Sequence, residues 1–326
     1  MSDRPVVHIL FTGGTISMRR DPVTGAALPA LSGREIVARV PGLRREARLR
    51  LEDLARLPGP HVSPAWMWRL RGRVERVLAD PAVHGVVITH GTDTLEETAF
   101  LLDLTVASPK PVVLCGAMRT FSDPGWDGPA NLTAAVRTAA HTDAARRGTL
   151  VVVGEEIHAA SRVRKWHTQR LDAFRSELGP VGVLDRGRVR FHAPAFRGPV
   201  LQPRRLVTAV DLHVLAAGSD DRLIRASLAH GARGLVLEGT GAGNVPPAAL
   251  PGIRAALRAR VPVVVVSRCG GGRVAPLYGF EGGGQRLAEM GAILGGDLGG
   301  PKARIKLMVA LGTTHDPAAL RRIFEG

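Results

Sequence analysis

Short apolar runs alternate with glycine-rich polar turns along the first half of the chain. Runs rich in Val, Ile and Leu occupy residues 6–11, 85–89, 111–115 and 149–153. Runs of this length and composition are typical of strands that are buried on both faces of a sheet. Residues 95–104 instead place apolar side chains at the helical period. This alternation predicts an α/β fold, in which a mostly parallel sheet lies between two layers of helices in a three-layer α/β/α domain.

The pattern changes near the middle of the chain. Residues 181–189 form two short apolar stretches around Asp-Arg-Gly, which predicts a hairpin. Residues 192–204 contain three prolines and few periodic apolar positions, as is common between domains. We therefore expect an N-terminal catalytic α/β domain over residues 1–190 and a linker over residues 191–205.

A second series of apolar runs follows this linker. The runs lie at residues 206–215, 234–238 and 262–267, and a helical pattern lies near residues 317–324. The series predicts a smaller, Rossmann-like C-terminal α/β domain over residues 206–326.

Composition excludes a membrane protein. Hydrophobic residues make up 45% of the chain, enough for a packed core. No apolar run approaches the roughly 20 residues that a membrane-spanning helix needs. The run at residues 6–11 is too short for the core of a signal peptide. We expect a cytoplasmic protein without a membrane partner.

The sequence offers no site for a metal or a cofactor. Cys115 and Cys269 each follow an apolar run, and we expect two buried free thiols without the spacing of a zinc site. The turn Gly239-Thr-Gly-Ala-Gly-Asn244 is similar to a dinucleotide-binding turn. However, no acidic residue ends the strand after it, so the acidic partner of a ribose is absent.

The positive charge does not by itself indicate a nucleic-acid partner. The formal net charge is +15, and the 44 basic residues include only four lysines. The arginines are scattered, and aromatic residues make up only 4% of the chain. Proteins that recognise RNA usually add stacking aromatic side chains, so we interpret the charge as an arginine bias on solvated faces.

Hydroxyl-bearing motifs follow two of the predicted strands. Thr12-Gly-Gly-Thr15 comes after the first, and His90-Gly-Thr-Asp-Thr94 comes after the second. Ligands of parallel sheets bind beyond the carboxyl ends of the strands. The glycines allow a tight turn from which Thr15 can project. Each motif alone is also compatible with an ordinary turn or helix cap, and Glu96 and Glu97 suit the first turn of a helix.

Together, the two motifs closely resemble the signature motifs of the bacterial-type L-asparaginase/glutaminase family. The resemblance covers nearly the whole chain. It continues through residues 86–113, Gly116-Ala-Met-Arg119, Asp127-Gly-Pro with Asn131, Lys165 in Arg-Val-Arg-Lys-Trp-His-Thr, residues 239–244 and Pro301-Lys-Ala-Arg304.

The resemblance implies a threonine amidohydrolase that converts L-asparagine to L-aspartate and ammonia through an acyl-enzyme. It implies that Thr15 is the nucleophile and that Thr92, Asp93 and Lys165 form a second catalytic group. Lys165 would accept a proton through Thr92, Asp93 would bind the α-ammonium of the substrate, and the Thr92 amide would stabilise the oxyanion. Asn244 would reach the site of a neighbouring subunit, which implies a homodimer or homotetramer.

Two positions depart from the pattern of the family. The family has a tyrosine after the first motif, but this chain has Ala27 near that place, and its one tyrosine is Tyr278. Tyr278 or water is therefore the candidate substitute. Where the family has a serine for the α-carboxylate of the substrate, this chain has Gly59-Pro60-His61, and the imidazole of His61 or backbone amides are the candidates.

The resemblance gives a set of expected substrate-binding residues and leaves alternatives open. The set is Gly14, Gly59, Pro60, His61, Gly91, Ala117 and Asn244. One alternative is a catalytically weak, asparaginase-like amino-acid binder or regulator. Another is a subunit similar to a tRNA-dependent amidotransferase. The motifs are equally compatible with asparagine, glutamine, D-asparagine or a modified amide.

Overall fold

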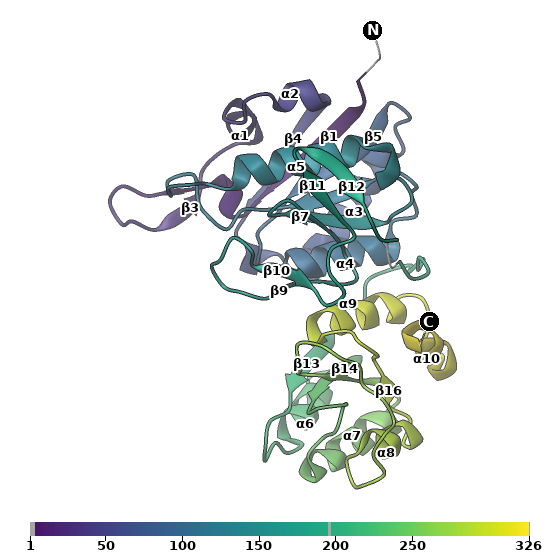
Figure 1. Ribbon diagram of the computed structural model, residues 1–326. Coiled ribbons are helices and arrows are strands. Elements are labelled where there is room, and N and C mark those ends of the chain that lie inside the picture. Colours follow the sequence, from purple (N-terminus) through teal and green to yellow (C-terminus); the bar gives the residue numbers. More distant parts are fainter. Residues whose placement is uncertain (1–3, 195–196, 326) are drawn as a thin grey trace. The chain divides into compact units, whose positions relative to one another are not determined.

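The protein divides into two compact units, Met1–Val200 and Leu201–Gly326 (Figure 1). The computed structural model describes residues 4–194 and 197–325. The division falls within residues 191–205, the expected linker, of which residues 195 and 196 lie outside the described part. Each unit has its own sheet and its own buried core.

An eight-stranded sheet forms the centre of the first unit, in the order β12-β11-β8-β7-β6-β5-β1-β4. The five neighbouring strands β4, β1, β5, β6 and β7 run parallel, and β8, β11 and β12 pair antiparallel. The expected mostly parallel sheet is therefore confirmed, and so is the predicted hairpin, which is β11 and β12. The strands are β1 (Val6–Gly13), β4 (Arg48–Leu57), β5 (Val83–Thr89), β6 (Val112–Cys115), β7 (Thr149–Val153), β8 (Glu156–Ala159), β11 (Gly182–Asp185) and β12 (Arg188–Phe191).

The edge strand β4 has no continuous apolar run. It begins Arg-Leu-Arg-Leu and pairs with β1 at the edge of the sheet. Alternating polar and apolar residues are typical of a strand with one covered face. A fully buried parallel strand has a continuous apolar run instead, which is why the other parallel strands are visible in the sequence and β4 is not.

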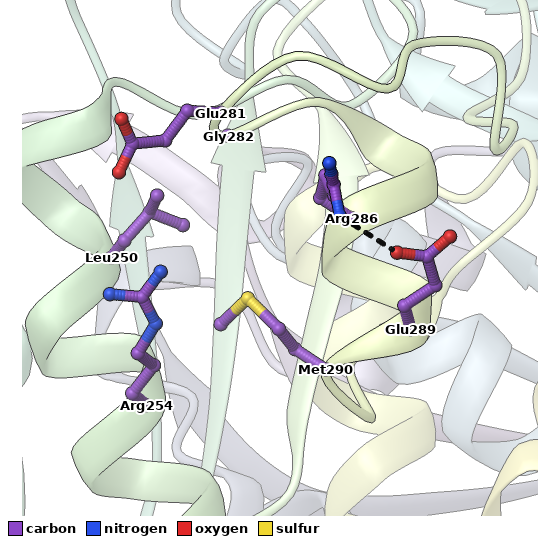
Figure 2. A pocket seen from close by; sticks show the side chains of 7 residues that line it. All are labelled: Leu250, Arg254, Glu281, Gly282, Arg286, Glu289 and Met290. Carbon is purple, nitrogen blue, oxygen red and sulfur yellow. Dashed lines mark ion pairs between the residues drawn. The ribbon is translucent and has the colours of Figure 1, made fainter.

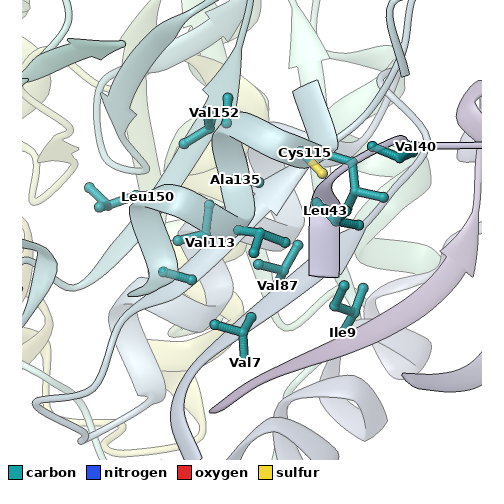
Figure 3. Close-up of a cluster of buried hydrophobic side chains, with 14 of the residues drawn as sticks. Val7, Ile9, Val40, Leu43, Val87, Val113, Cys115, Ala135, Leu150 and Val152 are labelled. Carbon is teal, nitrogen blue, oxygen red and sulfur yellow. The ribbon is translucent and has the colours of Figure 1, made fainter. Parts of the chain in front are cut away.

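Helices cover both faces of this sheet. Successive side chains of a strand point to opposite faces, so Val7 and Ile9 of β1 join one buried cluster and Val6 and Leu10 join the other. The first cluster packs against α5 and is shown in Figure 3. The three-layer arrangement is thus confirmed. The helices are α1 (Gly33–Ala38), α2 (Leu43–Glu46) and α5 (Gly128–Ala140) on one face, and α3 (Pro64–Leu78) and α4 (Leu95–Thr105) on the other.

Shorter elements complete the first unit. Two antiparallel hairpins are separate from the main sheet, and three 3₁₀ helices join larger elements. The hairpins are β2 (Met18–Arg20) with β3 (Ala27–Pro29) and β9 (Val163–Lys165) with β10 (Phe174–Ser176); the 3₁₀ helices are η1 (Thr15–Ser17), η2 (Gly59–His61) and η3 (Thr142–Ala144).

The second unit is a smaller α/β structure, as expected. Its four strands pair in parallel in the order β13-β14-β15-β16. Gly234 of β14 faces Leu307 and Leu311 of α9, while α6 and α7 share a buried cluster with the opposite face. The elements are β13 (Val210–Val214), β14 (Gly234–Gly239), β15 (Val263–Ser267), β16 (Ile293–Leu294), α6 (Arg222–Ala229), η4 (Pro247–Ala249), α7 (Leu250–Arg258), α8 (Gly284–Glu289), α9 (Gly300–Leu311) and α10 (Pro317–Glu325).

The structure corrects the expectation for one of the thiols. Cys115 is a buried free thiol at the end of β6, but Cys269 is exposed. It lies two residues beyond the end of β15, where the chain has left the sheet. Within the described residues, no helix is both long enough and apolar enough to cross a bilayer.

Candidate active site

Three glycines bring three strand ends into contact. Gly14 follows β1, Gly91 follows β5, and Gly59 follows β4. A Cβ atom on Gly14 would lie 2.4 Å from the Gly91 nitrogen, and one on Gly91 would lie 2.6 Å from the Gly59 Cα. Gly14 also has φ 79° and ψ 179°, a conformation essentially restricted to glycine. The backbones therefore touch, and both threonine motifs meet at the carboxyl ends of these strands.

Thr15 stands at the start of η1, directly after this contact. Its side chain is half-buried. The Gly14 carbonyl accepts hydrogen bonds from the Ser17 amide (3.0 Å) and hydroxyl (2.9 Å). The Thr12 hydroxyl donates to the Thr89 carbonyl at 2.6 Å and so ties β1 to β5. These bonds fix the turn from which Thr15 projects.

The structure brings Thr92, Asp93 and Lys165 together. Lys165 Nζ lies 2.8 Å from Thr92 Oγ1 and 2.7 Å from Asp93 Oδ1. Thr92 is buried, and the side chain of Lys165 is only 16% exposed, whereas that of Asp93 is 54% exposed. A charged Lys165 donates both bonds, while a neutral amine could accept the proton of the Thr92 hydroxyl. The cluster thus joins an amine to a hydroxyl on one side and to an accessible carboxylate on the other.

Gly59 is packed against this cluster, but its neighbours Pro60 and His61 are exposed. A Cβ atom on Gly59 would lie 3.3 Å from Asp93 Oδ2. The Gly59 carbonyl accepts the Thr94 hydroxyl at 2.8 Å. The backbone amide of His61 donates to Pro58 at 3.0 Å, so this amide is already used inside η2. The backbone amide of Gly59 and the imidazole of His61 therefore stay the candidates for binding a carboxylate at η2.

Ala117 is buried in a turn that other side chains hold in place. Asp127 accepts hydrogen bonds from the backbone amides of Met118 and Arg119, both at 2.9 Å. Asn131 Nδ2 donates to the Gly116 carbonyl at 3.0 Å. A Cβ atom on Gly116 would lie 3.1 Å from the Thr92 methyl group. Asp127 and Asn131 were visible in the sequence only as parts of a motif, and the structure assigns them to the support of this turn.

His90 is a further supporting residue that the motif alone did not reveal. The ring is fully buried; Nδ1 donates to the Gly91 carbonyl at 2.8 Å, and Nε2 accepts from the Thr98 hydroxyl at 2.9 Å. Burial lowers the pKa of His90 from 6.5 to about 4, against the weaker opposing effect of the bond to Gly91. A neutral His90 therefore locks the turn that precedes Thr92.

Asn244 and Tyr278 belong to the second unit. Asn244 ends a turn closed by two backbone bonds with Thr240, at 2.8 and 2.9 Å. Its Oδ1 atom is buried and has no hydrogen-bond partner among the described residues. Tyr278 is 44% exposed, and its ring lies 5.3 Å from that of Phe280. In the first unit, Ala27 is exposed on β3, so no side-chain hydroxyl stands at the place of the family tyrosine.

The second unit contains a surface pocket. Figure 2 shows this pocket, of about 430 Å³, between α7 and α8 of the second unit. Arg254 and Glu281 line it, together with Arg286, which pairs with Glu289. None of the expected site residues lines it. Nor do the described residues contain a group of three or more side chains that could hold a metal ion.

Comparison with known proteins assigns the family. Residues 6–197 match the family model for the asparaginase N-terminal domain. Residues 209–324 match the model for the glutaminase/asparaginase C-terminal domain. The chain belongs to the asparaginase family. Its two-domain architecture is that of this family.

Individual asparaginase relatives align over nearly the full chain. The Probable L-asparaginase of Deinococcus radiodurans is 38% identical over 331 residues, which cover 98% of this chain and 97% of the relative. The L-asparaginase of Bacillus licheniformis is 37% identical over 306 residues, covering 94% and 95%. The solved structure of the Probable Cytoplasmic L-asparaginase from Campylobacter jejuni has a TM-score of 0.91 at 32% identity and covers 99% of both chains.

The chain is also similar to a component of a tRNA-dependent enzyme. This relative, a Glutamyl-tRNA(Gln) amidotransferase component from Methanosarcina mazei, is 33% identical over 328 residues. The alignment covers 96% of this chain but 75% of that relative. The two L-asparaginases from Deinococcus radiodurans and Bacillus licheniformis are therefore more similar to this chain, both in identity and in the share of the relative that is matched.

Proposed function

We propose that this asparaginase-family protein is an amidohydrolase that converts L-asparagine and water into L-aspartate and ammonia. The named L-asparaginases that align over nearly its full length support this proposal. The observation that carries it is the Lys165–Thr92–Asp93 cluster, on the turn that packs against the Thr15 turn.

The first half of the reaction forms an acyl-enzyme. Thr15 Oγ1 attacks the side-chain carbonyl carbon of asparagine, and its proton passes toward the basic group at Thr92 and Lys165. The C–N bond then breaks, and the nitrogen leaves as ammonia after taking up a proton. In the second half, water attacks the ester, releases aspartate and restores the Thr15 hydroxyl.

Backbone and charged groups stabilise and orient the substrate. The Thr92 amide has no acceptor among the described residues and serves as the oxyanion donor, a contact worth roughly 3 kcal/mol of barrier. Oδ1 of Asp93 accepts the hydrogen bond from Lys165, and the other carboxylate oxygen, Oδ2, binds the α-ammonium of the substrate. Gly14, Gly91 and Ala117 form the walls of the substrate site.

The functional protein is a homodimer or homotetramer, located in the cytoplasm, that binds neither nucleic acid nor a membrane. The resemblance to the family supports a role for Asn244 in completing a neighbouring subunit's site. An exposed apolar cluster of Leu277, Tyr278 and Phe280 in the same unit suits a surface that becomes buried on association. The Campylobacter jejuni structure at 32% identity is of a protein described as probably cytoplasmic.

Ammonia release from a panel of amides tests the activity. We expect L-asparagine to be the best substrate among L-asparagine, D-asparagine and L-glutamine, and Thr15→Ala to abolish release. Calorimetric binding of asparagine without release would indicate a binder or regulator instead. Copurification with tRNA and transfer of ammonia to glutamyl-tRNA would indicate an amidotransferase-like component.

A further inference from the structure

Lys165 stands on an element that the main sheet does not hold. It is the last residue of β9, which pairs with β10 in a two-stranded hairpin. The ladder of the eight-stranded sheet therefore does not set its position. A lysine side chain is a flexible four-carbon stem, so the location of Nζ depends on how firmly the backbone of Lys165 is anchored.

Glu96 anchors that backbone directly. Its Oε2 atom accepts a hydrogen bond from the Lys165 amide at 2.6 Å. Glu96 lies in the first turn of α4, three residues after Asp93. Residues 92–96 thus hold Lys165 at two points. Glu96 binds its backbone amide, and Thr92 and Asp93 bind Nζ. A bond from an amide to a carboxylate is stronger than one between neutral groups.

The other strand of the hairpin has its own attachment. Ser176 of β10 lies 3.0 Å, Oγ to Nδ1, from the buried ring of His158 on β8. Phe174 of β10 and Val163 of β9 are buried in the core. These contacts do not involve Glu96, so the hairpin should stay folded and docked when the Glu96 side chain is removed.

We infer that Glu96 is a positioning residue: its carboxylate fixes the backbone of Lys165 so that Nζ stays within reach of Thr92 and Asp93. This inference rests on the proposed function, because it assigns Lys165 to the proton transfer. It differs from the role that the sequence suggested for Glu96, which was only to favour the start of α4 through the helix dipole. A dipole effect would change stability and leave turnover unchanged.

Steady-state kinetics of three variants test the inference. Glu96→Ala removes the acceptor, and we expect kcat to fall roughly 10- to 100-fold with little change in KM, since small displacements of catalytic groups have effects of this size. Glu96→Gln keeps an acceptor oxygen and should recover most of the lost kcat. Glu75→Ala removes a carboxylate that pairs with Arg71 on α3, and it should match the wild type. Equal kcat in wild type and Glu96→Ala would overturn the inference.

A spectroscopic signature provides a readout that does not need activity. The chain has only four lysines, so selective ¹⁵N-lysine labelling gives four backbone amide signals. The Lys165 amide should appear downfield because it donates to a carboxylate, and in Glu96→Ala this signal alone should move upfield. An unchanged Lys165 signal would contradict the contact. If the wild type releases no ammonia from any amide, the proposed function fails. The Lys165 amide signal still reports whether Glu96 holds the Lys165 backbone.

Discussion

At the scale of single residues, Thr15 depends on its surroundings for reactivity. A threonine hydroxyl is a weak nucleophile at its ordinary pKa and needs a base. The described site offers one amine, Lys165, and it reaches Thr92 on the turn that packs against the Thr15 turn. Ala27 brings no hydroxyl to the place of the family tyrosine, so the proposed mechanism relies on activation by the Lys165 group.

Removing the Thr15 hydroxyl should abolish turnover. We expect Thr15→Ala to lower kcat by about 10⁴-fold or more, because the loss of a nucleophile removes the covalent route. Thr15→Ser retains the hydroxyl and should retain part of the activity. Thr133→Ala, which removes a hydroxyl bonded only within α5 to the Pro129 carbonyl, is the control. Ammonia release above background by Thr15→Ala would exclude Thr15 as the nucleophile.

His90 should make the stability of the protein fall in mild acid. The unfolded chain takes up a proton below its ordinary pKa of 6.5, but native His90 stays neutral until about pH 4. Between these values the unfolded state binds more protons, so the free energy of unfolding decreases as the pH falls, by up to about 3 kcal/mol. Above pH 6.5 both states are neutral, and His90 contributes no pH dependence.

Urea unfolding of wild type and His90→Gln at pH 7.5, 6 and 5 measures this effect. The wild type should lose more stability than the variant as the pH falls, since contributions from other groups are common to both. Should the variant be too unstable, the histidine Cε1–H signals of the wild type give the same information. Parallel stability curves, or a His90 signal that titrates near pH 6.5, would refute the assignment.

At the scale of elements, the site depends on close contact between the ends of β1, β4 and β5. Gly14 and Gly91 allow these backbones to touch, because a side chain at either place would overlap a neighbouring backbone, and Gly59 leaves room for the side chain of Asp93. Thr15 and Thr92, the expected catalytic threonines, therefore lie on turns that are fixed relative to one another. A fixed arrangement keeps reacting groups in the geometry that the proposed reaction needs.

Gly14→Ala should both disrupt this contact and strain the backbone. Gly25 in the β2–β3 hairpin is a control for a positive φ without an overlap, because its φ is +70° but nothing lies within 4 Å of an added Cβ. Gly25→Ala should cost about 1 kcal/mol of stability from the backbone alone. Gly14→Ala adds the strain of a conformation restricted to glycine and the overlap with Gly91, and it should cost about 3 kcal/mol or more. Urea unfolding measures both, and equal losses would show that the contact is unimportant.

The sequence predicts the buried strands and both threonine motifs, because continuous apolar runs and the turns after them are local features. It predicts the edge strand β4 poorly, since Arg-Leu alternation leaves one face polar. The support from His90 and Glu96 arises from contacts over 8 and 69 positions along the chain. No local pattern contains such contacts, so the sequence shows these two residues only as motif letters or capping acids.

At the scale of the whole molecule, the second unit exposes a cluster of apolar side chains. Leu277 is 66% exposed and Phe280 is 55% exposed, and Tyr278 lies between them in the sequence. Clustered exposed apolar groups mark interaction surfaces, whereas scattered ones are ordinary. Because we propose that Asn244 of the same unit reaches a neighbouring subunit's site, we expect a second copy of the chain to occupy this surface.

Replacing Leu277 and Phe280 by serine should therefore weaken the proposed oligomer. We expect analytical ultracentrifugation to show a lower average mass for Leu277→Ser/Phe280→Ser than for the wild type at equal concentration. Leu223→Ser, which changes a solitary leucine on α6 that is 62% exposed, should leave the mass unchanged. Ammonia release should fall together with the mass, and return at high protein concentration, because the proposed shared site needs Asn244 from the neighbouring subunit. A wild type that sediments as a fully active monomer would contradict both the surface and the shared site.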